Sequence, residues 1–351
     1  MNAALALTMA LSLSSLGAVA QQLLTVPASA AASDGNAFTW LPGCGDSGAT
    51  QVIIDASHLQ TLVGRTLVGL SFRRDGTWLE GLPRSDAHWR VRLGPSTRGA
   101  DDPYLDFALN LPQGTVAFDG AVSMPAMPPI TGYVGWTAPH TVEIAFTTSF
   151  TYSGGPLAIE LEGSLTTPAA FFPMDGVDDP VRGAASDVGT ACGPRAPANG
   201  RTALAVGGGL VPGATAQLHL LGTAGNAAFA FFGVSLLPQP VNLTLIGAPG
   251  CQWYVDAFTA LAAPVVASGI PAVDGLASVR LHLPGTPTLL GGQLVVQWLE
   301  VGAGLVATSQ AMSLSISAQM PALGMAQLER LSDGSVHVAP ASGPVIGFRW
   351  L

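Results

Sequence analysis

Apolar and polar residues alternate with a period of two along much of the chain. In residues 88–93, for example, Trp89, Val91 and Leu93 alternate with polar residues. Successive strand residues point to opposite faces of a sheet, so this pattern predicts a half-buried strand. Further apolar, β-branched or alternating segments predict strands at residues 51–54, 65–72, 141–146, 156–162, 215–220, 241–245, 278–283 and 293–298.

Turn-forming residues separate these segments. Glycine and proline number 43 and 27, and they cluster between the apolar runs at intervals of about 10 to 20 residues. Helical periodicity is scarce, with short helical turns expected only at residues 57–64 and 257–261. The spacing favours antiparallel sheets over parallel α/β folds. We therefore expect an all-β fold of two antiparallel β-sandwich domains in tandem, jelly-roll or immunoglobulin-like, with little helix.

The uneven distribution of charge predicts the domain boundaries. Seven of the 13 basic residues lie between Arg65 and Arg98, whereas residues 201–327 contain only five charged side chains. Residues 189–200 have linker composition. We expect a signal peptide at 1–20, an N-terminal β-sandwich domain at 21–190, a C-terminal β-sandwich domain at 191–318 and an extension at 319–351. In the extension, residues 334–338 and 345–350 could form a hairpin.

The first 33 residues indicate export. Residues 2–33 carry no charge, and the apolar run ends in Ala18-Val19-Ala20, a small-x-small cleavage pattern. We interpret it as a secretory signal peptide; the alternative is an apolar helix of the mature fold. After Ala20, no stretch reaches the ~18 apolar residues that a membrane-spanning helix requires. We expect a protein of the extracellular space or cell surface, with the periplasm as an alternative.

Charge and motifs exclude several activities. The net charge is −9, and all 13 basic residues are arginines, so the chain has no lysine. An acidic chain lacks the basic surface that nucleic acid requires, and a P-loop or a Schiff-base enzyme requires lysine. No G-x-S-x-G elbow and no closely spaced histidine pair is present. We expect no catalytic residues and no required cofactor.

One loop, at residues 73–88, is unusually polar for this chain. A tryptophan face packs on sugar C–H groups, while carboxylates and guanidinium groups bind sugar hydroxyls. The loop could therefore bind a carbohydrate; alternatively, it is an ordinary surface loop in which Trp78 covers the edge of the core. The candidate ligand-binding residues are Trp78, Asp75, Glu80, Arg84 and Asp86.

A second acidic segment offers a candidate metal site. Asp175, Asp178 and Asp179 lie in a stretch bounded by glycine and proline, which we expect to be a loop. Carboxylate oxygens are the ligands that calcium prefers, although the EF-hand spacing is missing. The alternative is a solvated acidic turn.

The three cysteines, Cys44, Cys192 and Cys251, permit one disulfide after export, and their spacing does not choose among three pairings.

Several sequence segments resemble those of a known group of proteins. They are residues 25–38, residues 150–161, Gly247-Ala248-Pro249-Gly250-Cys251 and residues 283–291. They resemble uncharacterised secreted two-domain β proteins of planctomycete-like bacteria, which have a GAPGC-type β domain at the C-terminus. The resemblance implies export and a Cys192–Cys251 bridge, with Cys44–Cys192 as the competing pair.

The sequence thus predicts an exported, non-enzymatic structural or adhesive protein. Its expected partners are polysaccharide or other envelope proteins, and its oligomeric state is left open. The rival hypothesis is a lectin-like protein or a divergent carbohydrate-active enzyme that uses the loop at residues 73–88.

Overall fold

The computed structural model describes residues 21–40, 47–165, 172–193, 203–206, 209–268, 274–331 and 334–351. It confirms the all-β class, because strands dominate these residues and all their strand pairs are antiparallel. No helix in the described ranges is both long and apolar enough to cross a membrane. The helical elements among them are short: α1 (Phe107–Asn110) and the 3₁₀-helices η1 (Ala28–Ala30), η2 (Ala56–His58), η3 (Gln60–Leu62), η4 (Thr244–Ile246) and η5 (Pro287–Leu289).

Three sheets form what we call the first sheet group. The four-stranded sheet has the order β1 (Gln22–Val26), β22 (Ile346–Trp350), β4 (Thr66–Arg73) and β7 (Thr141–Thr151). The six-stranded sheet has the order β20 (Val336–Pro340), β19 (Met325–Leu331), β3 (Ser47–Ile54), β8 (Leu157–Leu165), β5 (Ser85–Pro95) and β6 (Thr115–Met124). The three-stranded sheet has the order β2 (Ala37–Trp40), β9 (Pro173–Asp178) and β21 (Ser342–Pro344).

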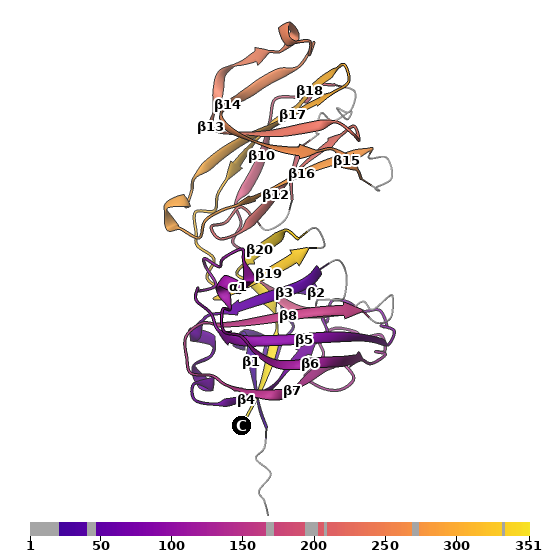
Figure 1. Cartoon of the computed structure of the whole chain (residues 1–351), viewed down its shortest axis with the longest axis vertical. Helices are drawn as coiled ribbons and strands as arrows, with labels where there is room; N and C mark the ends of the chain where they lie inside the picture. The colour runs from indigo at the N-terminus through magenta and orange to yellow at the C-terminus, as the bar shows by residue number, and fades with distance from the viewer. Residues whose placement is uncertain are drawn as a thin grey trace, which may run out of the picture.

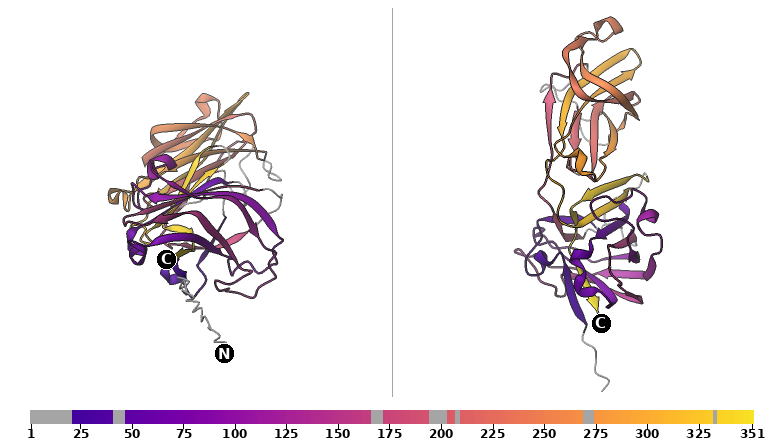
Figure 2. Two further views of the ribbon diagram at one scale, coloured as in Figure 1. Left: turned by 60° about the horizontal axis from the view of Figure 1, so that its bottom comes forward. Right: turned by 90° about the vertical axis from the view of Figure 1, so that its left-hand side faces the viewer.

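Two further sheets form the second sheet group, which lies beyond the first along the long axis of the molecule (Figure 1 and Figure 2). The five-stranded sheet has the order β10 (Ala184–Val188), β18 (Leu305–Ser315), β17 (Gln293–Gly302), β13 (Ala227–Asn242) and β14 (Gln252–Pro264). The four-stranded sheet has the order β11 (Ala203–Val206), β12 (Thr215–Gly222), β16 (Gly275–His282) and β15 (Val266–Ala267).

The chain leaves the first sheet group after β9 and returns to it at β19. Strand β10 pairs with β18, so the second sheet group begins before residue 190. Residues 319–351 complete the first group: β19 pairs with β3, β21 with β9, and β22 with both β1 and β4. The composition-based boundaries therefore do not separate the sheets, because long-range strand pairing leaves no compositional trace.

Two local expectations also differ from the structure. The segments expected to form a hairpin in the extension do not pair with each other, because β20 pairs with β19 and β22 lies in another sheet. Residues 257–261 are not helical; they belong to β14, where pairing with β13 overrides their alanine-rich helix propensity.

Each sheet group has its own apolar core. In β5, Trp89, Val91 and Leu93 are buried while His88 and Arg90 are exposed, as the alternation predicts. The ring of Trp89 meets Phe72 of β4 edge-on, with centroids 6.4 Å apart, so the six-stranded and four-stranded sheets share one core. A separate core in the second group surrounds the fully buried Trp298 of β17.

The two groups also touch directly. The backbone N–H of Gly285 donates to the Asp102 carboxylate at 3.2 Å, and the guanidinium of Arg280 on β16 donates to the hydroxyl of Ser335 beside β20. Both of these contacts are polar, whereas the cores are apolar and extensive. Each group therefore obtains most of its stability from its own core.

We predict that Phe348→Ala destabilises the first sheet group strongly. Phe348 is fully buried in β22, and truncating a buried phenylalanine costs about 3–5 kcal/mol. Urea unfolding followed by tryptophan fluorescence measures the change. Leu351→Ala, at a position 44% exposed, is the control and should change the unfolding free energy by less than ~0.5 kcal/mol. Equal effects of the two substitutions would contradict this placement of β22.

Candidate functional site

The segment 73–88, expected to be a loop, is shorter than predicted: Arg73 ends β4 and Ser85 begins β5, so the loop is residues 74–84. It is held by its own backbone and by two buried side chains. The carboxylate of Asp75 accepts hydrogen bonds from the N–H groups of Thr77, at 2.7 Å, and Trp78, at 3.2 Å. The guanidinium of Arg74 donates to the carbonyls of Pro128, Trp78 and Glu80. Asp75 and Arg74 are almost completely buried. They therefore shape the loop and do not present polar groups to a ligand.

Arg73, the last residue of β4 before this loop, forms an ion pair with Asp175 of β9, and neither side chain is exposed. Arg73 also donates to the carbonyls of Ala30, at 3.1 Å, and Ser33, at 2.7 Å, and its guanidinium lies 4.8 Å from the ring centre of Tyr133. Asp175 accepts a 2.7 Å hydrogen bond from the N–H of Gly35. The pair thus fastens the segment after β1 against β4 and β9.

The pKa of Asp175 reflects this burial. Desolvation raises its pKa to about 6, although the hydrogen bond and charge of Arg73 act in the opposite direction. Burial also raises the pKa of Asp34, whose carboxylate accepts from the N–H of Gly76 at 3.1 Å. The pKa of Asp175 is higher in the folded protein than in the unfolded chain. Its contribution to the free energy of unfolding is therefore fully present below the ordinary pKa of an aspartate and is lost as the pH rises to about 6.

The aromatic cluster beside the loop consists of Phe38, Trp40 and Trp78. Their rings meet edge-on: the centroid separations are 5.2 Å for Phe38–Trp40, 6.5 Å for Phe38–Trp78 and 6.3 Å for Trp40–Trp78. Phe38 is 47% exposed, and both tryptophans are partly exposed. Trp78 also packs against the first core. The cluster therefore combines a fixed position with accessible ring surface.

Phe38 and Trp40 are the two aromatic residues that the sequence interpretation missed. Their i, i+2 spacing in β2 is the signal that could have found them. Of the other expected ligand-binding residues, Asp75 accepts a hydrogen bond from the backbone N–H of Trp78 and is itself buried. Arg84 and Asp86 form an exposed pair with each other at 3.2 Å, and Glu80 is an exposed residue whose carbonyl is bound by Arg74.

The three carboxylates considered for calcium have separate protein partners. Asp175 is in strand β9, not in a loop, and faces Arg73. Asp178 pairs with Arg182, while Asp179 accepts from the N–H groups of Val181 and Ala322. Within the described ranges, no group of three histidine, cysteine, aspartate or glutamate side chains could hold a metal ion. The calcium site therefore gains no support from the structure.

A hollow of about 370 Å³ in the first group has titratable side chains in its wall. Asp55 accepts from the N–H of Ala100 at 3.0 Å, and the Nε2 atom of His58 lies 2.6 Å from the carbonyl oxygen of Leu323. Both side chains thus hold backbone segments around the hollow.

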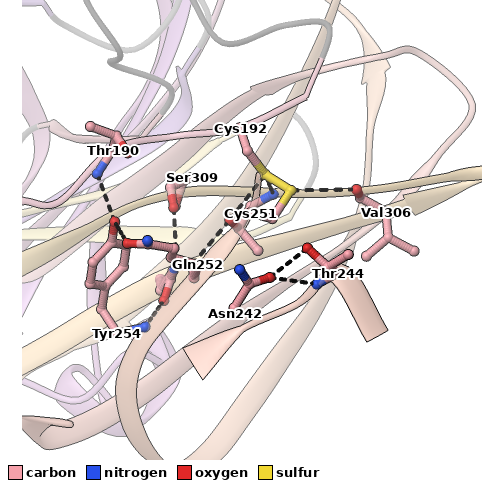
Figure 3. The surroundings of a disulfide bond; sticks show 11 residues. Thr190, Cys192, Asn242, Thr244, Cys251, Gln252, Tyr254, Val306 and Ser309 are labelled. Atoms are coloured by element: carbon pink, nitrogen blue, oxygen red, sulfur yellow. Dashed lines mark hydrogen bonds between the residues drawn. A yellow bond between two sulfur atoms is a disulfide. The ribbon is translucent and has the colours of Figure 1, made fainter. Parts of the chain in front are cut away.

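Cys192 and Cys251 form a disulfide, as the resemblance implied (Figure 3). Cys44 lies outside the described residues. The bond ties the segment after β10 to the turn between β13 and β14. In that turn, the carboxamide of Asn242 accepts from the N–H of Thr244 at 2.8 Å, and Gly247 and Gly250 have φ angles of 85° and 79°. The glycines of the Gly-Ala-Pro-Gly-Cys phrase therefore serve a tight turn.

This turn belongs to a long, exposed apolar hairpin, which we define as β13, β14 and residues 243–251 between them. It lies at the end of the molecule farthest from the C-terminus (Figure 1). Leu245 is 98% exposed and Ile246 62% exposed at its tip, and Phe258 on β14 is 65% exposed. Large exposed apolar surfaces on a folded protein mark interaction sites.

Comparison of the chain with protein-family models, curated proteins and solved structures finds no match.

We predict that Arg73→Met destabilises the protein by about 3 kcal/mol at pH 8, because it leaves the Asp175 carboxylate buried without its partner. Removing the Arg73 charge raises the pKa of Asp175 further, so the variant keeps losing stability as the pH rises above 6. The cost should therefore be smaller at pH 5 than at pH 8.

Urea unfolding at the two pH values measures this difference. Arg84→Met removes an exposed ion pair and is the matched control, with an expected change below ~0.5 kcal/mol at both pH values. A cost for Arg73→Met that is the same at pH 5 and pH 8 would contradict the role assigned to Asp175.

Proposed function

We propose that this protein is an exported, non-enzymatic structural or adhesive β protein of the cell surface or extracellular space. It attaches to other envelope proteins through its apolar hairpin. The observation that carries the proposal is the exposure of Leu245, at 98%, and Ile246, at 62%, on a turn tied by a disulfide. Such a turn presents apolar surface without the entropy cost of ordering a flexible loop.

Two further observations support this function. Disulfides persist mainly in oxidising compartments, which agrees with the uncharged N-terminal segment interpreted as a signal peptide. The resemblance to secreted two-domain β proteins of planctomycete-like bacteria points in the same direction.

We predict that the double variant Leu245→Ser and Ile246→Ser is released from the envelope of cells that produce the protein. Burying one leucine contributes ~1.5–3 kcal/mol, so the ratio of released to retained protein should rise at least about ten-fold. Quantitative immunoblotting of washed cells and medium measures this ratio. Leu109→Ser, at an exposed leucine of the first sheet group, is the control and should stay retained. Equal retention of all three proteins would refute the attachment role.

The aromatic cluster supports a second candidate function, the binding of polysaccharide. Three aromatic rings with partly exposed surfaces lie within 6.5 Å of each other, and an aromatic face can stack on a sugar ring. Arg84 comes from the same loop and Asp86 from the start of β5, and their paired side chains, 67% and 39% exposed, carry hydrogen-bonding groups. This function uses the opposite part of the molecule from the apolar hairpin, so the two are compatible.

We predict that Trp78→Ala weakens polysaccharide binding at least about ten-fold, a loss of ~1.4 kcal/mol. A glycan panel followed by isothermal calorimetry with the best ligand measures the effect on mature protein of residues 21–351. Trp40→Ala should weaken binding similarly, whereas Trp253→Ala, in the apolar hairpin, should not. Unchanged affinity of the folded Trp78 and Trp40 variants would exclude the cluster as a sugar site.

A further inference from the structure

Strand β14 forms one edge of the five-stranded sheet. It pairs with β13 on one side, and no strand pairs with its other side in the described part of the chain. The pairing of residues 259–264 with residues 227–232 is regular, and register shifts begin only at Gly233. The open side of this regular stretch therefore presents a row of backbone N–H and C=O groups that can pair with another strand.

The side chains of β14 do not protect this edge. Natural edge strands are usually guarded by lysine, inward-pointing charge or an interior proline. The chain contains no lysine, and the only charged residue of β14 is Asp256. Residues 256–262 are all exposed, and most of them are small: Ala257, Thr259, Ala260 and Ala262. Small side chains let a second backbone approach closely.

The charge distribution favours a second copy of this chain as the occupant. The whole chain carries a net charge of −9, yet residues 184–318 contain three arginines and four acidic residues, a net charge of −1. Two copies therefore repel each other least where their second sheet groups meet. An antiparallel strand edge is also self-complementary, because a twofold axis pairs it with its own image.

We propose that β14 pairs antiparallel with β14 of a second copy, joining two five-stranded sheets edge to edge in a symmetric dimer. A twofold axis near Ala260 places Asp256 opposite the partner's Pro264, so the two carboxylates are not adjacent. The biological role of this dimer rests on the proposed function. Within that function, the dimer gives the strands of the apolar hairpin a specific partner, a second copy of the chain. It leaves the tip with Leu245 and Ile246 free for attachment.

Sedimentation equilibrium of the mature protein, residues 21–351, tests the proposal. The expected species is a dimer, and Ala260→Lys should raise the dimer dissociation constant at least about ten-fold because it places a charge on the shared edge. Ala262→Lys is a second variant on the same strand with the same expected effect. The matched control is Ala185→Lys on β10, the exposed opposite edge of the same sheet, and it should leave association unchanged. Near-UV circular dichroism verifies that each variant is folded.

Two results would overturn the proposal. One is a wild-type protein that stays monomeric up to ~100 µM. The other is an equal loss of association in the β10 variant, which would indicate head-to-tail chains joining β10 to β14. The retention assay uses tip variants and the sedimentation assay uses edge variants, so each can fail separately. A monomer that is still retained would remove only the self-pairing, whereas a dimer that is not retained would remove the attachment function.

Discussion

The ion pair between Arg73 and Asp175 joins the end of β4 to the central strand of the three-stranded sheet, with both side chains shielded from water. Burying two charges costs several kcal/mol each, so the pair persists only because each partner has further hydrogen bonds. Those bonds come from the backbone of the segment between β1 and β2. The same contacts place β2, with Phe38 and Trp40, beside the loop that carries Trp78. Together with the pairing of β2 and β9, the ion pair therefore helps to position the aromatic cluster.

Local patterns predicted part of this architecture. The alternation in β5 identified Trp89, Val91 and Leu93 as core residues, and the all-β class followed from alternation and turn spacing. Asp175 shows the limit of that approach. Its partner Arg73 is 102 residues away, and a glycine and prolines around it are typical of a loop, yet it lies in a strand between two others. Partners so distant in sequence are set by tertiary packing, which a local pattern does not encode.

The candidate site shows the same limit. Trp78 was identified from its polar surroundings, but Asp75 and Arg74 hold the loop and do not face outward. The rings that accompany Trp78 come from another strand, 38 residues or more before it in the chain. By contrast, the glycines of the Gly-Ala-Pro-Gly-Cys segment have the turn-forming role that glycine and proline predict locally. The pairing of its cysteine with Cys192, 59 residues away, was implied only by the resemblance.

The place of β22 has a consequence for synthesis. This strand lies between β1 and β4, so the sheet that contains β1, the first strand among the described residues, also needs residues 346–350. All strands of the second sheet group, in contrast, have been made once residue 315 has been added. Domains usually fold in the order in which the ribosome makes them. Here the second sheet group can form during synthesis before β22 has been made, whereas the sheet that contains β1 is complete only after β22.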